Sequence, residues 1–331
     1  MTEGKKVRSE GVRSALGRTL AAFPAPIAGW LRELATTPGA CAVVRAEEAT
    51  AWARTLGVTV PELMLRLVGW AACYADVPIS NYRVGAVARG LSGALYAGAN
   101  LEFPGLPLSC SVHAEQSATT NAWVHGEEGL DTIAVGAAPC GYCRQFLYEL
   151  VTAERLEILL PERPATPLSA LLPGAFGPRD LGVAGGLMQP QSHELVLAPR
   201  SARDSNAADT ANAPIASRSN DETRETIAAA LAAANASYAP YGKTYAGVAL
   251  RTADGALYEG RYAESAAFNP SMSPVQAALA HLTLCGRTYA DIAGAALVES
   301  TGPISQRDAT AQVLAAISPV MLTYARAVPA S

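Results

Sequence analysis

The sequence predicts an α/β fold in which a three-layer α/β/α core with a mixed sheet occurs twice, preceded by a small N-terminal helical segment. Segments with strand-like and helix-like periodicity alternate along the first half of the chain, as in a sheet covered by helices. Four residues of this half recur at a constant offset in the second half: Gly85, Tyr96, Gly98 and Glu102 return as Gly247, Tyr258, Gly260 and Glu264. We therefore expect two copies of one fold.

The 331 residues divide into four expected parts. Residues 1–58 are expected to be a helical segment, and residues 59–198 the main domain. Residues 199–222 are rich in Ser, Arg, Asp, Asn and Ala without apolar periodicity, which is typical of a flexible linker. Residues 223–331 would form the second, degenerate copy. The first part is assigned to helix because apolar side chains recur at helical spacing: Leu16, Leu20, Ile27, Leu31 and Leu34.

Within the main domain, strands and helices are expected to alternate. Paired strands are expected at 83–90 and 93–101, and further strands at 131–137 and 156–160. Helices are expected at 116–123 and over the segment that starts at Cys140, where apolar side chains keep helical spacing through 144–152. In the second copy, the segment 254–258 begins with Asp-Gly, which favours a hairpin turn. The order of these elements predicts a mixed sheet sandwiched between helices.

Two motifs contain the residues that we expect to be catalytic: His113-Ala114-Glu115 and Pro139-Cys140-Gly141-Tyr142-Cys143. One imidazole and two thiolates, from His113, Cys140 and Cys143, make a zinc site whose fourth position is open to water, which is typical of catalytic zinc. Two thiolates already neutralise the charge of the ion, so its water is less acidic than in an all-histidine site and needs a nearby base. Glu115 is the candidate for that base.

The spacing of these residues also predicts where they lie on their helices. Cys140 and Cys143 are three apart, so both sulfurs share one helix face, and Pro139 suits a helix start. His113 and Glu115 are two apart and do not share a face within a helix, so we place them in a first turn. Two helix N-termini are therefore expected to converge on one ion, where the helix dipoles favour the thiolates.

Four segments carry a resemblance to a known family: His-Ala-Glu-Gln-Ser-Ala at 113–118, Pro-Cys-Gly-Tyr-Cys-Arg-Gln at 139–145, Ala-Asn-Leu-Glu-Phe at 99–103 and Ala-Phe-Gly-Pro at 175–178. With them the chain resembles the cytidine deaminase family, in its two-domain, homodimeric bacterial and plant type. The resemblance implies a cytidine-deaminase-like core, one Zn²⁺ per chain and a homodimer. It also implies hydrolytic deamination of cytidine and 2′-deoxycytidine to uridine and 2′-deoxyuridine, with release of ammonia, in pyrimidine salvage.

The resemblance further implies the substrate contacts. Asn100 and Glu102 would hold the ribose hydroxyls, Tyr82 would pack on the pyrimidine, and the backbone at Ala114 would read the base edge. Phe176 would close the site of the neighbouring subunit. Similar proteins usually have Phe at the position of Tyr82. An anionic Glu102 beside the sugar would repel a 5′-phosphate and so favour nucleosides over nucleotides.

The second copy lacks the metal ligands. It has Ser273-Pro274-Val275 where the first has His113-Ala114-Glu115, and no Cys-x-x-Cys follows. Neither Ser273 nor Val275 replaces a ligand or a proton carrier, so we expect this copy to serve packing and assembly.

Several alternatives remain open at this point. A closed structural zinc site could use Cys110 in Cys110-x-x-His113 as a fourth ligand, or Cys140 and Cys143 could be a redox pair. The chain could instead deaminate a modified cytosine nucleoside of specialised metabolism, be a non-catalytic zinc protein, or edit a polynucleotide. The last is the weakest, because a formal charge of −4 does not favour a polyanion.

Composition fits a nucleoside as the partner, with no nucleic acid and no membrane. The N-terminus lacks an apolar signal core and no apolar run is long enough to span a bilayer, so a cytoplasmic location is expected. The six cysteines show no evident disulfide framework. Cys41, Cys73 and Cys285 are expected to be small buried apolar residues, and no function is assigned to His125, His193 or His281.

Overall fold

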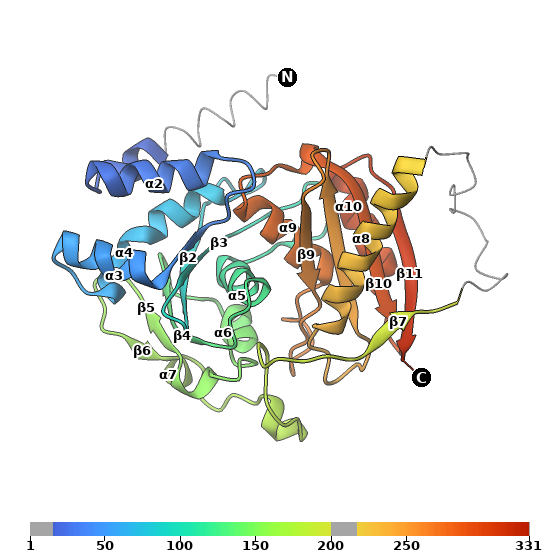
Figure 1. Ribbon diagram of the computed structural model, residues 1–331. Coiled ribbons are helices and arrows are strands. Elements are labelled where there is room, and N and C mark those ends of the chain that lie inside the picture. Colours follow the sequence, from blue (N-terminus) through green and yellow to red (C-terminus); the bar gives the residue numbers. More distant parts are fainter. Residues whose placement is uncertain (1–15, 200–216, 331) are drawn as a thin grey trace. The chain divides into compact units, whose positions relative to one another are not determined.

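The computed structural model describes residues 16–199 and 217–330, which fall into two compact units (Figure 1). The first unit comprises the chain up to Gln189 together with Ser265–Met272 and Ala280–Thr288; the second comprises Pro190–Glu264, Ser273–Leu279 and the chain from Tyr289. Most of the expected linker, 200–216, lies outside the described residues, and 217–222 belong to the helix α8, Ser217–Asn235. The division at 58/59, 198/199 and 222/223 stays a prediction.

The N-terminal segment is largely helical, with residues 16–20 in helix, followed by α2 (Ala25–Thr36), α3 (Ala46–Leu56) and α4 (Val60–Ala71). Residues 1–15 lie outside the described part. Helix α4 begins at a capping box, in which the Thr59 hydroxyl accepts from Glu62 N and the Glu62 carboxylate accepts from Thr59 N. The apolar stripe is buried as expected, at Leu16, Leu20, Ile27 and Leu31, with Leu34 packed against the same core.

The first unit contains a mixed six-stranded sheet in the order β1-β3-β2-β4-β5-β6. Its hairpin strands β2 (Gly85–Gly90) and β3 (Leu95–Ala99) are antiparallel, β2 is antiparallel to β4 (Leu130–Val135), and β4 is parallel to β5 (Glu157–Leu159). Two-residue strands close the edges, β1 (Val43–Val44), which was not predicted, and β6 (Thr166–Pro167). Besides α2, α3 and α4, this unit contains α5 (Ala114–Val124), α6 (Gly141–Leu147) and α7 (Leu168–Leu171).

The helix expected from Cys140 to about 152 begins where predicted but is shorter, because it ends at Leu147. Beyond it, Leu187 N donates to Glu149 O at 2.7 Å and Val151 N donates to Leu187 O at 3.0 Å. These backbone groups therefore pair with a segment about forty residues downstream instead of continuing the helix.

The second unit contains a mixed five-stranded sheet in the order β7-β11-β10-β8-β9. Strand β8 is antiparallel to both β9 and β10, and β10 is parallel to β11. This is the arrangement of β2 with β3, β4 and β5, so the expected duplication is confirmed. Besides α8, this unit contains β7 (Leu195–Leu197), β8 (Ala246–Thr252), β9 (Leu257–Arg261), β10 (Ile292–Ser300), α10 (Arg307–Ile317) and β11 (Leu322–Pro329). Helix α9 (Pro274–Leu284) begins in this unit, and its residues from Ala280 onward belong to the first.

Short 3₁₀ helices connect the larger elements: η1 (Ala72–Tyr74), η2 (Leu108–Cys110), η3 (Ala153–Arg155), η4 (Pro178–Leu181) and η5 (Tyr289–Asp291). Within the described ranges no single helix is long and apolar enough to cross a membrane, although the bent pair Ala46–Leu56 and Val60–Tyr74 meets the length and composition criteria when taken together.

The recurring glycines mark the places where a helix lies directly on the sheet. A Cβ on Gly98 would stand 2.2 Å from Ala118 N of α5, and one on Gly260 would stand 2.1 Å from Pro274 O of α9. Gly85 faces α4 and Gly247 faces α8 in the same way. Because each helix backbone occupies the place of a side chain, only glycine fits at these positions in both copies.

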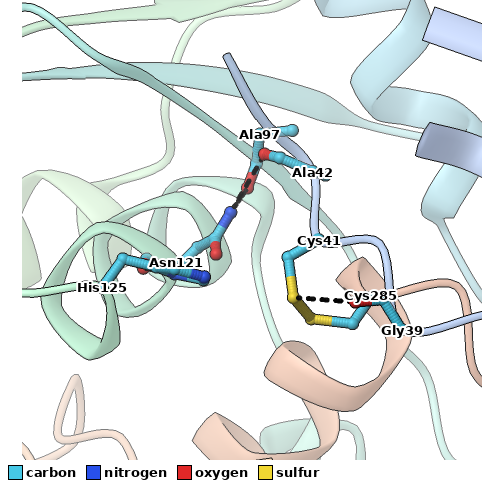
Figure 2. The surroundings of a disulfide bond; sticks show 7 residues. All are labelled: Gly39, Cys41, Ala42, Ala97, Asn121, His125 and Cys285. Carbon is cyan, nitrogen blue, oxygen red and sulfur yellow. Dashed lines mark hydrogen bonds between the residues drawn. A yellow bond between two sulfur atoms is a disulfide. The ribbon is translucent and has the colours of Figure 1, made fainter. Parts of the chain in front are cut away.

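Cys41 and Cys285 form a disulfide (Figure 2), although the spacing of the cysteines showed no disulfide framework, so the expectation that both serve only as small buried apolar residues is wrong. The two residues are 244 positions apart, so spacing along the chain gave no sign of the pairing. Cys285 is buried and Cys41 is partly buried. Cys73 is buried and forms no disulfide, as expected of a small apolar residue.

Candidate metal centre and active site

His113, Cys140 and Cys143 come together as one group of metal-type donor atoms, all within 4.8 Å of one another. Cys140 Sγ lies 3.6 Å from His113 Nδ1 and 3.6 Å from Cys143 Sγ. Zinc bonds of about 2.0–2.3 Å in a tetrahedron place two donor atoms about 3.3–3.8 Å apart. The donor set and its spacing therefore both fit zinc.

The ligand group is assembled at two helix N-termini. His113 is the N-cap residue of α5, and its backbone N–H donates to Gln116 Oε1 at 3.2 Å. Cys140 is the N-cap residue of α6, and its sulfur accepts from Cys143 N at 3.4 Å. The two helix starts that the spacing predicted thus meet at the donor atoms, where unpaired N–H groups stabilise thiolates.

The two cysteines share a proton in the absence of metal. Hydrogen bonding with Cys143 lowers the pKa of the Cys140 thiol to about 5, and the same bond, together with burial, raises the pKa of Cys143. One member of the pair is thus a thiolate at neutral pH, which is the form that binds a metal.

Glu115 is buried in the first turn of α5, with 4% of its surface exposed. Burial raises the pKa of its carboxyl group, which also hydrogen bonds with Cys143. Among the described residues Glu115 does not belong to the ligand group, although it touches one member of it. A carboxyl group beside the donor atoms, with its pKa moved toward neutrality, is suited to accept and return protons.

Cys110 lies outside the ligand group in the part of the chain that the structure describes. It occupies the end of η2, and burial raises the pKa of its thiol. Within residues 16–199 and 217–330, a closed site with four protein ligands therefore lacks its fourth donor. Cys140 and Cys143 are not joined as a disulfide either.

The strand end at 100–102 lies beside the metal centre. Leu101 N donates to Val112 O and Val112 N to Leu101 O, both at 2.9 Å, so this segment is paired with the residue before His113. Asn100 Oδ1 accepts from Val84 N at 2.9 Å, and its Nδ2 donates to Tyr82 O at 2.9 Å. Asn100 therefore fixes the loop that carries Tyr82, whose side chain is 64% exposed.

Glu102 anchors the same loop from its other end. Its carboxylate accepts from Ile79 N at 2.8 Å, Ser80 N at 3.0 Å and Ser80 Oγ at 2.5 Å. Desolvation raises the pKa of Glu102, but the hydrogen bonds from Ser80 and Ile79 outweigh it, so the pKa is lowered overall. A carboxylate accepts about four hydrogen bonds, so this anchoring leaves capacity for a ligand.

The second copy uses the equivalent glutamate in the same way. Glu264 accepts from Tyr241 N and Gly242 N, both at 2.8 Å. Since the second copy lacks the metal ligands, loop anchoring by this glutamate belongs to the repeated fold itself. This role of Glu102 was not foreseen from the sequence, although the recurrence of the residue pointed to a shared structural purpose.

The two remaining expected contacts differ in exposure. Ala114 is buried as the first residue of α5 and packs over Gly98. Phe176 is 45% exposed, and its carbonyl accepts from Gln145 Nε2 at 2.8 Å. Gln145 follows the second cysteine closely, so helix α6 fixes the position of the segment that carries Phe176.

Three residues support the site without having been singled out from the sequence. The Tyr142 ring stacks on His113, with ring centroids 5.3 Å apart. Arg144 donates to Pro139 O at 2.8 Å and to Leu171 O at 2.7 Å, which holds the residue before Cys140 in place. Gln116 caps His113, as described above, and also donates to Pro270 O at 3.2 Å. The sequence indicated these supporting roles through one feature, the nearness of the three residues to the metal ligands along the chain.

Comparisons with known proteins agree with this geometry. Residues 59–158 and 168–311 each match a family described as "Cytidine and deoxycytidylate deaminase zinc-binding region". A cytidine deaminase of Vibrio cholerae is 42% identical over 315 residues, covering 95% of this chain and 99% of the relative, and one of Aeromonas salmonicida is 49% identical over 265 residues, covering 79% and 82%.

A solved structure, the cytidine deaminase of Mycobacterium tuberculosis, is 31% identical, with a TM-score of 0.33, and the match covers 35% of this chain and 96% of that one.

The family matches in both halves of the chain also agree with the duplicated fold. The second half has Ser273 and Val275 where the first has a ligand and a carboxyl group. On its sequence and on the zinc-type donor set, this chain belongs to the cytidine deaminase family of zinc-dependent hydrolytic enzymes.

Proposed function

We propose that this protein hydrolyses cytidine and 2′-deoxycytidine to uridine and 2′-deoxyuridine, with release of ammonia. One observation carries the proposal: three donor atoms at zinc spacing lie next to a buried carboxyl group that is not among them. The matched relatives are named cytidine deaminases, and the alignment with this chain covers nearly their whole length. This similarity supports the proposal.

His113, Cys140 and Cys143 would hold the zinc. When bound, the ion supplies an activated water as the nucleophile. Helix dipoles at the starts of α5 and α6 offset part of the negative charge of the two thiolates, which would otherwise weaken the ion as an electrophile.

Glu115 moves the protons. It accepts one from the attacking water and delivers it to N3 of the pyrimidine, which makes C4 more electrophilic. After oxygen has bonded to C4, Glu115 takes the remaining proton of the new hydroxyl and delivers it to the exocyclic amine. The C4–N bond then breaks, a C4=O bond forms and ammonia leaves. Burial favours the neutral carboxyl group, so one side chain serves as base and then as acid.

The remaining residues would bind and orient the nucleoside. Asn100 and Glu102 would hold the ribose hydroxyls with the hydrogen-bonding capacity that loop anchoring leaves. Tyr82 would pack on the base and the backbone at Ala114 would read its edge. Charge repulsion by Glu102 would disfavour a 5′-phosphate.

Assembly and cellular role belong to the same proposal. The protein would act as a homodimer in which Phe176, half exposed in one chain, closes the site of the partner. It would work in pyrimidine salvage in the cytoplasm, on a free nucleoside instead of a nucleic acid.

The variant Glu115→Gln tests the assignment. Loss of both proton transfers should lower kcat for cytidine by about 10²-fold to 10⁴-fold, while zinc content, measured by atomic emission, stays at the wild-type level because Glu115 is outside the ligand group. The exposed Glu128→Gln is the matched control and should keep full activity.

Normal turnover by Glu115→Gln would reject the assignment. A panel of nucleosides compared by kcat/KM would show whether a modified cytosine nucleoside is preferred. Bound zinc without ammonia release from any of them would indicate the non-catalytic alternative.

A further inference from the structure

A second group of metal-type side chains lies elsewhere in the first unit. Donor atoms of Cys41, His125 and His281 all fall within 4.8 Å of one another. Cys285 is bonded to Cys41, so its sulfur adjoins the same place (Figure 2). The first compact unit contains all four residues, which offer two sulfurs and two imidazoles. None of them takes part in the proposed deamination.

The imidazole of His125 is held by a backbone carbonyl in the way that is common for metal-bound histidines. His125 Nδ1 lies 2.8 Å from Asn121 O, and a carbonyl oxygen only accepts, so Nδ1 carries the proton. Nε2 of the neutral ring then keeps its lone pair for a metal, the arrangement found around most metal-bound histidines. The His281 ring meets the His125 ring edge-on, with centroids 5.7 Å apart.

The backbone keeps the two cysteines together independently of the disulfide. Gly39 N donates to Cys285 O at 2.8 Å and Ala42 N donates to Leu284 O at 3.0 Å, on either side of Cys41. Asn121 Nδ2 of helix α5 also donates to Ala42 O at 3.3 Å. Breaking the sulfur–sulfur bond would therefore leave both sulfurs near the imidazoles.

We propose that Cys41, His125, His281 and Cys285 bind a second zinc ion when Cys41 and Cys285 are reduced. Four protein ligands of the Cys₂His₂ type make a closed, structural site, in contrast to the three-ligand centre at His113. The disulfide and the metal are then two alternative cross-links between the segment around Cys41 and the end of α9.

The exchange between the two states balances chemically. A dithiol reductant breaks the disulfide, giving two cysteine thiols, and is itself oxidised to a cyclic disulfide. Binding of Zn²⁺ then displaces the two thiol protons into solvent. The sulfurs must separate to about 3.8 Å, the distance between two thiolates on one tetrahedral zinc, which side-chain rotation allows while the backbone bonds persist. His125 is exposed, so the ion has access from solvent.

The test counts zinc in the full-length protein. Protein with the disulfide intact and protein reduced with dithiothreitol are each equilibrated with Zn²⁺, desalted and measured by atomic emission. The reduced form should hold about one zinc ion per chain more than the oxidised form. His281→Gln should abolish this difference, whereas His193→Gln, a histidine outside the group, should keep it.

The same count in a Cys140→Ser/Cys143→Ser background separates this proposal from the proposed function. The reduced double variant should still bind about one zinc ion per chain, although two of the three active-site ligands are gone. Equal zinc content in the oxidised and reduced wild-type protein, or a gain that survives His281→Gln, would overturn the second site. Neither result would bear on deamination, which is measured by ammonia release.

Discussion

Gly98 offers a test of how closely helix α5 must lie on the sheet for the active site to form. A Cβ at this position would stand 2.2 Å from Ala118 N and 2.3 Å from Ala114 O. Ordinary contact begins at 3.4 Å, so the helix would have to move by about 1.2 Å in Gly98→Ala. The first turn that moves carries Glu115 and begins at His113.

This displacement predicts two losses. Overpacking of this kind costs about 1–3 kcal/mol of unfolding free energy, and a misplacement of about 1 Å costs about 10²-fold in rate. Urea unfolding and kcat for cytidine measure the two effects. We also expect weaker zinc binding, because His113 moves away from Cys140.

The second copy supplies a matched control. Gly260→Ala places a Cβ 2.1 Å from Pro274 O of α9, a clash of the same size beneath a helix that begins beside Ser273 instead of a metal ligand. It should destabilise the protein by a similar amount without releasing the active-site zinc. Gly29→Ala, with no atom within 4 Å of the new Cβ, should not destabilise it. Full activity of Gly98→Ala, or equal zinc loss in Gly260→Ala, would refute the reasoning.

Two further predictions concern the support of the site. Arg144→Lys loses the pair of hydrogen bonds to Pro139 O and Leu171 O. Zinc affinity, measured in competition with a chelator, should therefore fall by about 10-fold to 100-fold. The control Arg179→Lys, at an exposed residue, should leave the zinc affinity unchanged. The folded-state pKa of Glu102 is lowered from its ordinary value of 4.5, so the ionised form stabilises the fold above that pH, and this contribution is lost as the pH falls through the folded-state pKa. The difference in unfolding free energy between wild type and Glu102→Gln should therefore shrink from pH 7 to about pH 3; a constant difference would contradict the loop-anchoring role.

The parts of the molecule that sequence predicted best depend on local spacing. The helix starts at His113 and Cys140 follow from ligand spacing and from Pro139, and the structure has His113 and Cys140 as N-cap residues of α5 and α6. The duplicated sheet follows from glycines that recur because a helix backbone occupies the space of their side chains. A few neighbouring residues or a repeated contact determine such features, so they can be predicted from the sequence before the fold is known.

The parts that sequence did not predict depend on long-range contacts. The Cys41–Cys285 disulfide joins residues 244 positions apart, and β1 is two residues long and exists through its pairing with β3. The anchoring of Ile79 and Ser80 by Glu102 likewise spans more than twenty positions. No local pattern reports such contacts, because the partners meet only when the sheet has formed.

The most direct test of the account is X-ray absorption at the zinc edge of protein with its disulfide intact, in which only the active-site metal is expected. Three protein ligands and one water predict two sulfur atoms at about 2.3 Å and two lighter atoms at about 2.0–2.1 Å. The same shell should persist in Glu115→Gln. A third sulfur in the shell, which Cys110 would supply, would show that the ion has no position for water and would contradict the proposed chemistry.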